Sequence, residues 1–280
     1  MRGKRANPPV LKRFGQHFLT DQSALSAIAD AVAPEAGEMV VEIGPGRGAL
    51  TDMLAARGNP LIAIEIDRAL ATSLRERYAS MDHVTIVEDD VLRVDLSAIA
   101  GARFVVADNV PYYITTPILF HVLRQPFPRS AVFLVQKEVA DRMVSPAGSK
   151  TYGALSVNVQ AVARVEIVRE VPRGSFSPPP KVDSAVVRVV PRSDPLVALA
   201  EIERFRVFVQ GLFGMRRKQI GNSLRGVAGL SAEESVAALE SAGIEPSRRV
   251  ETMSPEEIIR LMRGLSRQVP STCRGSSARR

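Results

Sequence analysis

The sequence contains few of the residues that form disulfides and metal sites. Cys273 is the single cysteine among 280 residues, which excludes an intramolecular disulfide. The three histidines stand far apart, and none fits a metal-ligand spacing, so no metal is expected. No apolar run approaches membrane-spanning length, and no apolar signal core follows the basic N-terminus. We therefore expect a soluble cytoplasmic protein with no membrane association.

Acidic residues are missing from three stretches of a chain whose net charge is +7. Residues 1–20 hold five basic residues, residues 204–225 hold six, and residues 258–280 hold six arginines. Such stretches favour a polyanionic partner, although solvated surfaces would show the same pattern, and for the last dozen residues we prefer that simpler interpretation. The candidate RNA-binding residues are Lys12, Arg13, Arg216, Arg217 and Lys218.

Short β-branched runs alternate with amphipathic segments in the first two thirds of the chain. This alternation predicts an α/β fold with a parallel sheet covered on both faces. The expected strands are 39–43, 61–66, 84–87, 104–107 and 131–135, and the expected helices are 49–57, 68–78, 116–123 and 137–144. Two further apolar runs, 157–168 and 185–190, are expected to complete the sheet as an antiparallel hairpin at one edge.

The pattern changes after Pro191, where β-branched runs stop and helix caps appear. Ser231 with Glu234 and Ser254 with Glu257 have capping-box spacing, and Pro255 occupies a favoured first helical position. We predict a domain at 1–191 that includes a basic segment at 1–20, a helical RNA-binding domain at 192–268 and a disordered tail at 269–280.

A glycine-rich loop at residues 42–48 closes a predicted strand and opens a predicted helix. Glycines at positions 44, 46 and 48 let the backbone turn sharply and approach a ligand closely, as an ordinary tight turn also would. Residue 49 is alanine, so the dinucleotide fingerprint is the poorer match. Glu42 beside the loop suits a cationic ligand better than a phosphate. Gly44 and Gly46 are therefore candidate cofactor contacts.

Carboxylates follow the next two predicted strands. Glu65 stands where doubly wound folds place the acid that binds ribose hydroxyls, and Asp90 can accept a hydrogen bond from an adenine amine. Each acid alone could simply cap a helix. The glycine-rich loop, Glu65 and Asp90 follow one another at the ends of successive predicted strands. Together they favour S-adenosyl-L-methionine (SAM), a cofactor that carries its own reactive methyl group.

The fourth predicted strand leads into a turn that suits an adenine amine, a poor nucleophile whose lone pair is delocalised into the ring. The Asn109 side-chain oxygen and a backbone carbonyl at Val110 or Pro111 can hold the two amine hydrogens, and Tyr112 can stack on the base. A plain proline turn with a core tyrosine is the alternative. Such chemistry needs no strong general base, and we interpret Asp108 as a solvated loop acid.

An adenine inside a duplex must be flipped out to reach such a turn, which costs on the order of a few kcal/mol. Stacking on an aromatic side chain contributes roughly 1–3 kcal/mol per base. Tyr112 with a second aromatic, for which Phe176 is the candidate, could offset that cost.

Seven motifs in order along the chain strengthen this interpretation. They are Lys12–Leu19, Glu42–Gly48, Asn109–Tyr112, Gln136–Arg142, Gly148–Lys150 with Tyr152 and Gly153, Phe176–Ser184, and Arg216–Lys218 with Asn222–Leu224. Together they resemble the bacterial small-subunit rRNA adenine N6-dimethyltransferases, the kasugamycin-resistance family, over nearly the whole chain.

The resemblance implies a Rossmann-like class I SAM methyltransferase domain followed by a small all-helical domain. It also implies dimethylation of two adjacent adenines in the 3′-terminal hairpin loop of small-subunit (16S) rRNA within an immature 30S particle, by an enzyme that we expect to be a monomer. By position, it assigns target contacts to Asn109, Tyr112 and Phe176 and cofactor contacts to His17, Leu19, Gly44, Glu65, Asp90 and Asn109.

Three residues depart from the pattern of this family. His17 replaces a usual asparagine, Asp108 a small residue and Val110 a leucine. A negative charge at Asp108 could change how the amine is oriented or how far methylation proceeds.

Three other functions compete with this interpretation. A large-subunit (23S) rRNA adenine methyltransferase of the macrolide-resistance type would use the same chemistry. A non-catalytic ribosome-assembly factor would show a broken Asn109–Tyr112 turn or lost acids, and both are intact. A small-molecule methyltransferase leaves the acid-free stretch 204–225 without a purpose.

Overall fold

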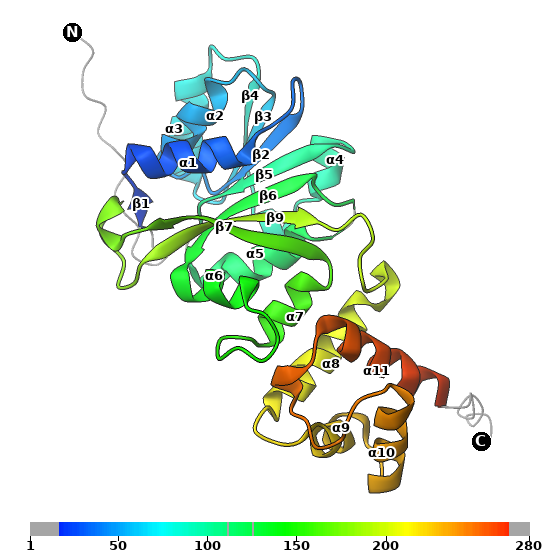
Figure 1. Ribbon diagram of the computed structural model, residues 1–280. Helices are drawn as coiled ribbons and strands as arrows, with labels where there is room; N and C mark the ends of the chain where they lie inside the picture. The colour runs from blue at the N-terminus through cyan, green and yellow to red at the C-terminus, as the bar shows by residue number, and fades with distance from the viewer. Residues whose placement is uncertain (1–16, 111, 125, 269–280) are drawn as a thin grey trace, which may run out of the picture. The chain divides into compact units, whose positions relative to one another are not determined.

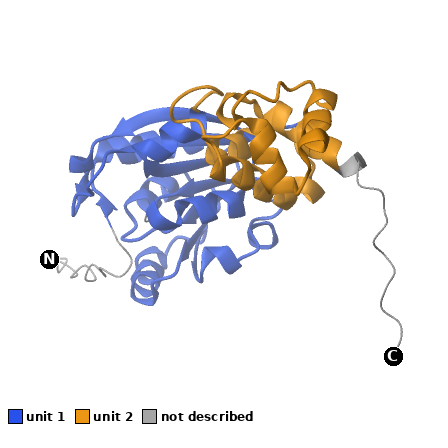
Figure 2. Ribbon diagram, turned by 90° about the horizontal axis from the view of Figure 1, so that it is seen from below, with its two compact units in different colours: residues 1–144, 163–193 blue, residues 145–162, 194–280 orange. Residues whose placement is uncertain are grey.

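The structure is a computed structural model that describes residues 17–110, 112–124 and 126–268. Lys12, Arg13, Pro111 and the predicted tail 269–280 lie outside these residues. The chain forms two compact units, residues 1–144 with 163–193 and residues 145–162 with 194–280 (Figure 2). The second unit thus takes in an internal segment, 145–162, that the sequence pattern places in the first predicted domain.

The first unit is built on a seven-stranded sheet with the order β4-β3-β2-β5-β6-β9-β7 (Figure 1). Its strands are β2 (Met39–Ile43), β3 (Leu61–Glu65), β4 (Val84–Glu88), β5 (Phe104–Asp108), β6 (Ser130–Gln136), β7 (Ala163–Val171) and β9 (Ser184–Pro191). Strands β2 to β6 are parallel, and β9 runs antiparallel to both β6 and β7. The predicted α/β sheet with an antiparallel edge is confirmed.

Helices cover both faces of this sheet. They are α1 (Gln22–Val32), α2 (Ala49–Ala55), α3 (Arg68–Tyr78), α4 (Leu96–Ala100), α5 (Thr115–Val122) and α6 (Lys137–Val144). Figure 1 shows α1, α2 and α3 on one side of the sheet and α5 and α6 on the other. The apolar stripe of α1 (Leu25, Ile28 and Val32) is fully buried against β5, β6 and neighbouring strands. The parallel pairing of β2 with β5 brings the carboxyl ends of these two strands to one edge of the sheet.

One predicted strand is wrong in its first half. The apolar run 157–168 begins inside helix α7 (Ala154–Gln160), and only its later residues belong to β7. The Ser156 hydroxyl accepts a hydrogen bond from the Gly153 N–H at 3.1 Å and so caps the helix start. Short apolar runs do not distinguish a buried helix from a buried strand, which explains the error.

The rest of the second unit is helical, with α8 (Ile202–Gly214), α9 (Ile220–Ala228), α10 (Ala232–Ser241) and α11 (Pro255–Gln268). Both predicted capping boxes form: the Glu234 N–H donates to Ser231 Oγ at 3.1 Å, and the Glu257 N–H donates to Ser254 Oγ at 3.3 Å. The buried face of α8 is formed by Phe205, Phe208, Val209 and Leu212. This face of α8 therefore forms part of the hydrophobic core of the second unit.

A small second sheet joins the start of the described chain to a distant segment. Strand β1 (Phe18–Leu19) pairs antiparallel with β8 (Phe176–Ser177), so that Leu19 lies opposite Phe176. The Thr20 N–H extends this contact by donating to the Ser175 carbonyl at 2.8 Å. This pairing places residues 17–19 beside the carboxyl edge of the large sheet, next to the glycine loop.

Candidate functional site

The glycine loop after β2 has the conformation that its sequence predicts. Gly44, Gly46 and Gly48 all have positive φ, at 66°, 58° and 80°. A Cβ atom on Gly44 would lie 2.7 Å from Val110 Cγ1, and one on Gly48 would lie 2.9 Å from the Tyr78 hydroxyl. The loop therefore requires glycine for its backbone conformation and for its close contacts with neighbouring elements.

Glu65, the last residue of β3, is tied to this loop. Its Oε2 accepts a hydrogen bond from the Gly46 N–H at 3.0 Å, and its Oε1 accepts one from the Asp67 N–H at 2.9 Å. Burial raises the pKa of the Glu65 carboxyl, although these backbone hydrogen bonds oppose the rise. The carboxylate is thus held in one orientation at the cavity wall.

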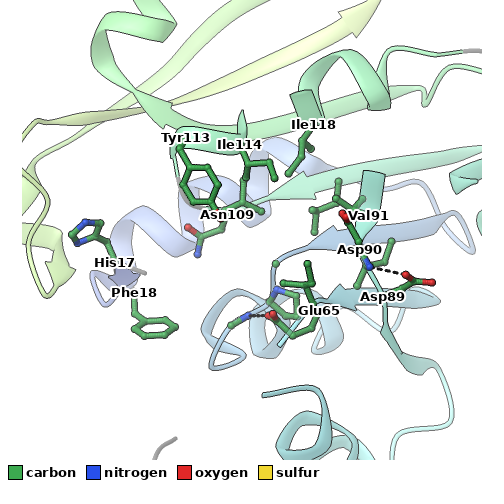
Figure 3. A pocket seen from close by; sticks show the side chains of 17 residues that line it. His17, Phe18, Glu65, Asp89, Asp90, Val91, Asn109, Tyr113, Ile114 and Ile118 are labelled. Carbon is green, nitrogen blue, oxygen red and sulfur yellow. Dashed lines mark hydrogen bonds between the residues drawn. The ribbon is translucent and has the colours of Figure 1, made fainter. Parts of the chain in front are cut away.

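A cavity lies at this edge of the sheet, and residues from several strand ends line it (Figure 3). His17 and Phe18 lie at one end, Asp89 and Asp90 at the other, and Asn109 lies between them. Seven of the predicted site residues line it: His17, Gly44, Gly46, Glu65, Asp90, Asn109 and Val110. Further residues line the cavity that were not predicted from the sequence, among them Phe18, Ile66, Asp89, Tyr113 and Ile118.

Asp90 combines the two roles that the sequence left open. Its Oδ1 accepts a hydrogen bond from the Leu92 N–H at 3.0 Å and caps a short 3-10 helix, Val91–Arg93. The same residue lines the cavity, and about a third of its side chain is exposed. The capping hydrogen bond fixes the Asp90 side chain, and this side chain still lines the cavity where a ligand would bind.

The turn after β5 brings Asn109 to the cavity and Tyr112 beside it. The Asn109 N–H donates to the Ile43 carbonyl at 3.3 Å, which ties the turn to the start of the glycine loop. The Tyr112 hydroxyl lies 2.5 Å from Ser184 Oγ, so the ring is anchored at its far end. Tyr113 lines the cavity and is 66% exposed.

Tyr112 is not among the residues that line the cavity, and neither are two other predicted contacts, Leu19 and Phe176. Leu19 and Phe176 lie opposite each other in the β1–β8 pair, and both belong to the hydrophobic core, with exposures of 2% and 5%. In this structure the Phe176 ring packs inside the protein.

Comparison with known proteins identifies the family. The profile of the ribosomal RNA adenine dimethylase family matches residues 10–266. The chain belongs to this family. It is 44% identical over 256 residues to the ribosomal RNA small subunit methyltransferase A of Acidobacterium capsulatum, with 90% of each chain covered. It is 45% identical over 264 residues to the protein of the same name from Geobacter metallireducens, with 91% and 94% covered. The resemblance inferred from the seven motifs is confirmed.

Solved structures share the fold of this chain. The 23S rRNA methyltransferase ErmE is 31% identical with a TM-score of 0.69, and the match covers 89% of this chain and 99% of ErmE. A dimethyladenosine transferase from Plasmodium falciparum, at 24% identity, has a TM-score of 0.77 with 90% and 98% covered, which shows the shared fold. The predicted class I methyltransferase fold with a helical C-terminal part is confirmed.

Within this dimethylase fold, the interpretation of Asp108 as a solvated loop acid is wrong. Asp108 ends β5 and is fully buried, and neither of its oxygens has a hydrogen-bond partner of normal geometry among the described residues. Burial raises the pKa of its carboxyl well above the usual value, and the Val110 N–H only partly opposes this rise. Burial therefore disfavours the negative charge that was considered from the sequence.

Asp108→Asn tests whether that charge matters to a dimethylase. Because asparagine has the same shape and is neutral, we expect an unchanged methyl-transfer rate and an unchanged ratio of monomethyladenine to dimethyladenine. Mass spectrometry of the product nucleosides measures that ratio. Asp108→Gly is less informative because it also removes buried volume. A shifted ratio with Asp108→Asn would show that the ionised form acts in the reaction.

Glu42 also differs from its expected role beside a cationic ligand. It does not line the cavity, and its side chain is fully buried. Burial raises its pKa to about 8; the Thr51 hydroxyl opposes this rise, whereas the Glu65 and Asp52 carboxylates add to it. Because Glu42 is buried outside the cavity lining and its raised pKa disfavours a negative charge, the structure does not bear out the expected role beside a cationic ligand.

The predicted RNA-binding residues of the second unit follow α8. Arg216, Arg217 and Lys218 are all exposed, and Arg216 Nε lies 3.8 Å from Glu251 Oε2. Lys218 also lines a surface hollow with Gln219, Asn222 and Arg225. Exposed cations at these positions can contact an anionic backbone.

The described residues contain neither a candidate membrane span nor a candidate metal site. In the ranges 17–110, 112–124 and 126–268, no helix is long and apolar enough to span a bilayer. Over the same part of the chain, no group of three or more His, Cys, Asp or Glu side chains could hold a metal ion.

Proposed function

We propose that this chain transfers methyl groups from SAM to the N6 amines of two adjacent adenines in the 3′-terminal hairpin loop of small-subunit (16S) rRNA, dimethylating each. The supporting observation is a cavity that joins the glycine loop, the strand-end acids and Asn109 in a chain 44–45% identical to small-subunit methyltransferases over about nine tenths of its length. We propose further that it acts as a cytoplasmic monomer on an immature 30S particle.

The residues of the cavity fit SAM. Gly44 and Gly46 line the cavity without side chains, so a ligand can approach the backbone of the loop closely. Glu65 and Asp90 supply acceptors for ribose hydroxyls and an adenine amine, and Ile66 offers an exposed apolar surface between them. When bound, SAM supplies an electrophilic methyl group, so the protein has only to orient and desolvate the acceptor.

On this proposal the turn after β5 prepares the target amine. The Asn109 side-chain oxygen and the Val110 carbonyl accept the two amine hydrogens, which directs the nitrogen lone pair away from the base plane. The Asn109 backbone is held by its 3.3 Å hydrogen bond to Ile43, so the acceptor is positioned before the base arrives. Methylation makes the amine acidic, and its proton can pass to water.

Nucleoside mass spectrometry of small-subunit rRNA tests the function. Cells lacking this gene should lose dimethyladenine at the two adjacent positions, and complementation should restore it. The purified protein should also methylate small subunits from those cells and should leave protein-free large-subunit rRNA unmodified. Dimethyladenine in the large-subunit RNA alone would contradict the proposal.

Salt dependence tests the RNA contacts of the second unit. Each phosphate contact with single-stranded RNA contributes a slope of roughly −0.7 to log K against log salt. Charge reversal at Arg216, Arg217 and Lys218 should weaken binding and flatten that slope. Reversal of Arg103, an exposed cation of the other unit, is the control and should leave the slope as it is. An unchanged slope in the triple variant would remove these residues from the interface.

A further inference from the structure

The second half of the glycine loop is held by the end of helix α3. Gly44, Pro45 and Gly46 line the cavity, whereas the next two residues, Arg47 and Gly48, do not. The backbone carbonyls of both these residues accept hydrogen bonds from α3. One half of the loop is therefore open to a ligand, and the other half is fixed to a neighbouring helix.

Two successive residues of α3 supply the donors. Arg77 Nη1 donates to the Arg47 carbonyl at 3.0 Å. The Tyr78 hydroxyl shares its single hydrogen between Asp52 Oδ1 at 2.7 Å and the Gly48 carbonyl at 3.2 Å. Arg77 Nη2 also donates to Asp52 Oδ2, so this carboxylate of α2 orients both donors. Together Asp52, Arg77 and Tyr78 form a loop clamp.

The protonation state of Tyr78 suits this role. Burial raises the pKa of its hydroxyl, and the hydrogen bond to Asp52 and the negative charge of Asp52 raise it further. The hydroxyl therefore keeps its proton across the physiological range and remains a donor.

The loop clamp acts on a backbone that is costly to order. Gly44, Gly46 and Gly48 all have positive φ. Glycine loses more conformational freedom on ordering than any other residue. Fixed contacts to the Arg47 and Gly48 carbonyls restrict this freedom before a ligand binds, which is the condition for tight binding by a preformed loop.

The loop clamp also reaches the cavity wall through Arg47. The guanidinium carbon of Arg47 lies 4.3 Å from the centroid of the Phe18 ring, which is a cation–π contact. Phe18 lines the cavity (Figure 3), and its ring lies 3.1 Å from the position that a Cβ atom on Gly46 would take. By holding the Arg47 backbone, Arg77 thus helps to fix an aromatic wall as well as the loop.

We propose that Arg77 and Tyr78 are positioning residues for the cofactor, which order the glycine loop and Phe18 before SAM binds. This inference rests on the proposed function, because it takes SAM as the ligand of the cavity. Neither residue lines the cavity, so both act through the loop. Contacts that bind the ground state and the transition state equally change affinity and leave kcat as it is. The loop clamp therefore sets the dissociation constant of the cofactor and not the rate of methyl transfer.

Tyr78→Phe removes the donor and keeps the buried ring. We expect it to raise the dissociation constant of S-adenosylhomocysteine, the product form of SAM, by about 5- to 10-fold, the ratio that corresponds to roughly 1–1.4 kcal/mol for one net hydrogen bond. Calorimetry measures this constant, and Arg77→Met should change it in the same direction. At saturating SAM, both variants should methylate small subunits from cells lacking this gene with the wild-type kcat. A variant that lowers kcat and keeps its affinity would overturn the proposal.

Tyr152→Phe and Arg57→Met are the matched controls. Tyr152 is buried like Tyr78, and its hydroxyl also donates to a backbone carbonyl, that of Met253, at 2.8 Å. Arg57 pairs with a carboxylate of another helix, that of Asp30. Neither control residue lines the cavity. Both control variants should keep the wild-type affinity, whatever their effect on the melting temperature. A control that loses as much affinity as its partner variant would show a general effect of destabilisation and overturn the proposal.

Hydrogen exchange gives a second readout that needs no ligand. The N–H groups of Gly44, Gly46 and Gly48 all donate hydrogen bonds, to the Ile64 carbonyl, to Glu65 and to the Pro45 carbonyl. In Tyr78→Phe the amides of residues 44–48 should exchange faster than in wild type, whereas those of β2 should keep their rates. Equal exchange across 44–48 in the two proteins would contradict a loop ordered by Tyr78.

The outcomes distinguish the two proposals. Wild type that does not bind S-adenosylhomocysteine overturns the proposed function and the loop clamp together. Wild type that binds it, with the same affinity as Tyr78→Phe and Arg77→Met, overturns the loop clamp alone.

Discussion

Asn109→Ala is expected to lower kcat for methyl transfer by about 100- to 1,000-fold, the effect of removing one pre-organised hydrogen-bonding group from an active site. Asn109 lines the cavity and comes directly after β5, where its backbone is tied to Ile43. Without the side-chain oxygen, the target amine keeps its lone pair in the ring and is not aimed at the methyl group. Single-turnover rates on undermethylated small subunits measure the effect.

Asn109→Asp is the matched variant, because it keeps an acceptor oxygen of the same reach and replaces the amide NH2 group with a second, charged oxygen. It should retain more activity than Asn109→Ala. Since Asn109 is also assigned to the cofactor, SAM affinity should be measured in parallel by calorimetry. An alanine variant that binds SAM normally and works at the wild-type rate would contradict the whole mechanism.

The largest effect on stability is expected from Glu42→Gln. The folded-state pKa of Glu42 is raised to about 8 from 4.5, so the folded protein keeps a proton that the unfolded chain releases. Stability is therefore lost as pH rises from about 4.5 to 8 and is constant above that range. At about 1.36 kcal/mol per unit, the free energy of unfolding falls by at most roughly 5 kcal/mol.

Glutamine removes this titration and keeps the shape of the side chain. Glu42→Gln should match wild type near pH 5 and be more stable by up to a few kcal/mol at pH 8. Urea unfolding of the protein without ligand at both pH values measures this difference. Asp108 and Glu65 also have raised pKa values, and both groups are present in wild type and in the variant. The effect of Glu42 is therefore the difference in the free energy of unfolding between the two proteins at each pH. An equal shift at both pH values would show that Glu42 is ionised in the folded state.

The sequence was sufficient to predict the cavity where local patterns and sheet topology coincide. Parallel strands bring their carboxyl ends to one edge, so a glycine loop after β2, Glu65 after β3 and Asp90 after β4 had to be neighbours. Asp89 was missed beside Asp90 because adjacent acids at a strand end give no signal for which one faces the ligand.

Burial and long-range contacts were harder to predict. Asp108 and Glu42 lie on neighbouring strands, and both carboxyl side chains are buried in the interior. From sequence alone an acidic residue is expected to be exposed, so their burial was not predicted. The orientation of His17 depends on Pro178, 161 residues away, and no local pattern encodes that contact. The burial of Phe176 likewise depends on the pairing of β1 with β8.

The pairing of β1 with β8 also determines when the site can be completed during synthesis of the chain. Residues 17–19 are synthesised more than 150 residues before their hydrogen-bonding partners at 175–178. A nascent chain can form the glycine loop and the strand ends well before it can position His17. The lining of the cavity is therefore complete only when nearly the whole first unit has been synthesised, so a shorter translation product lacks a finished site.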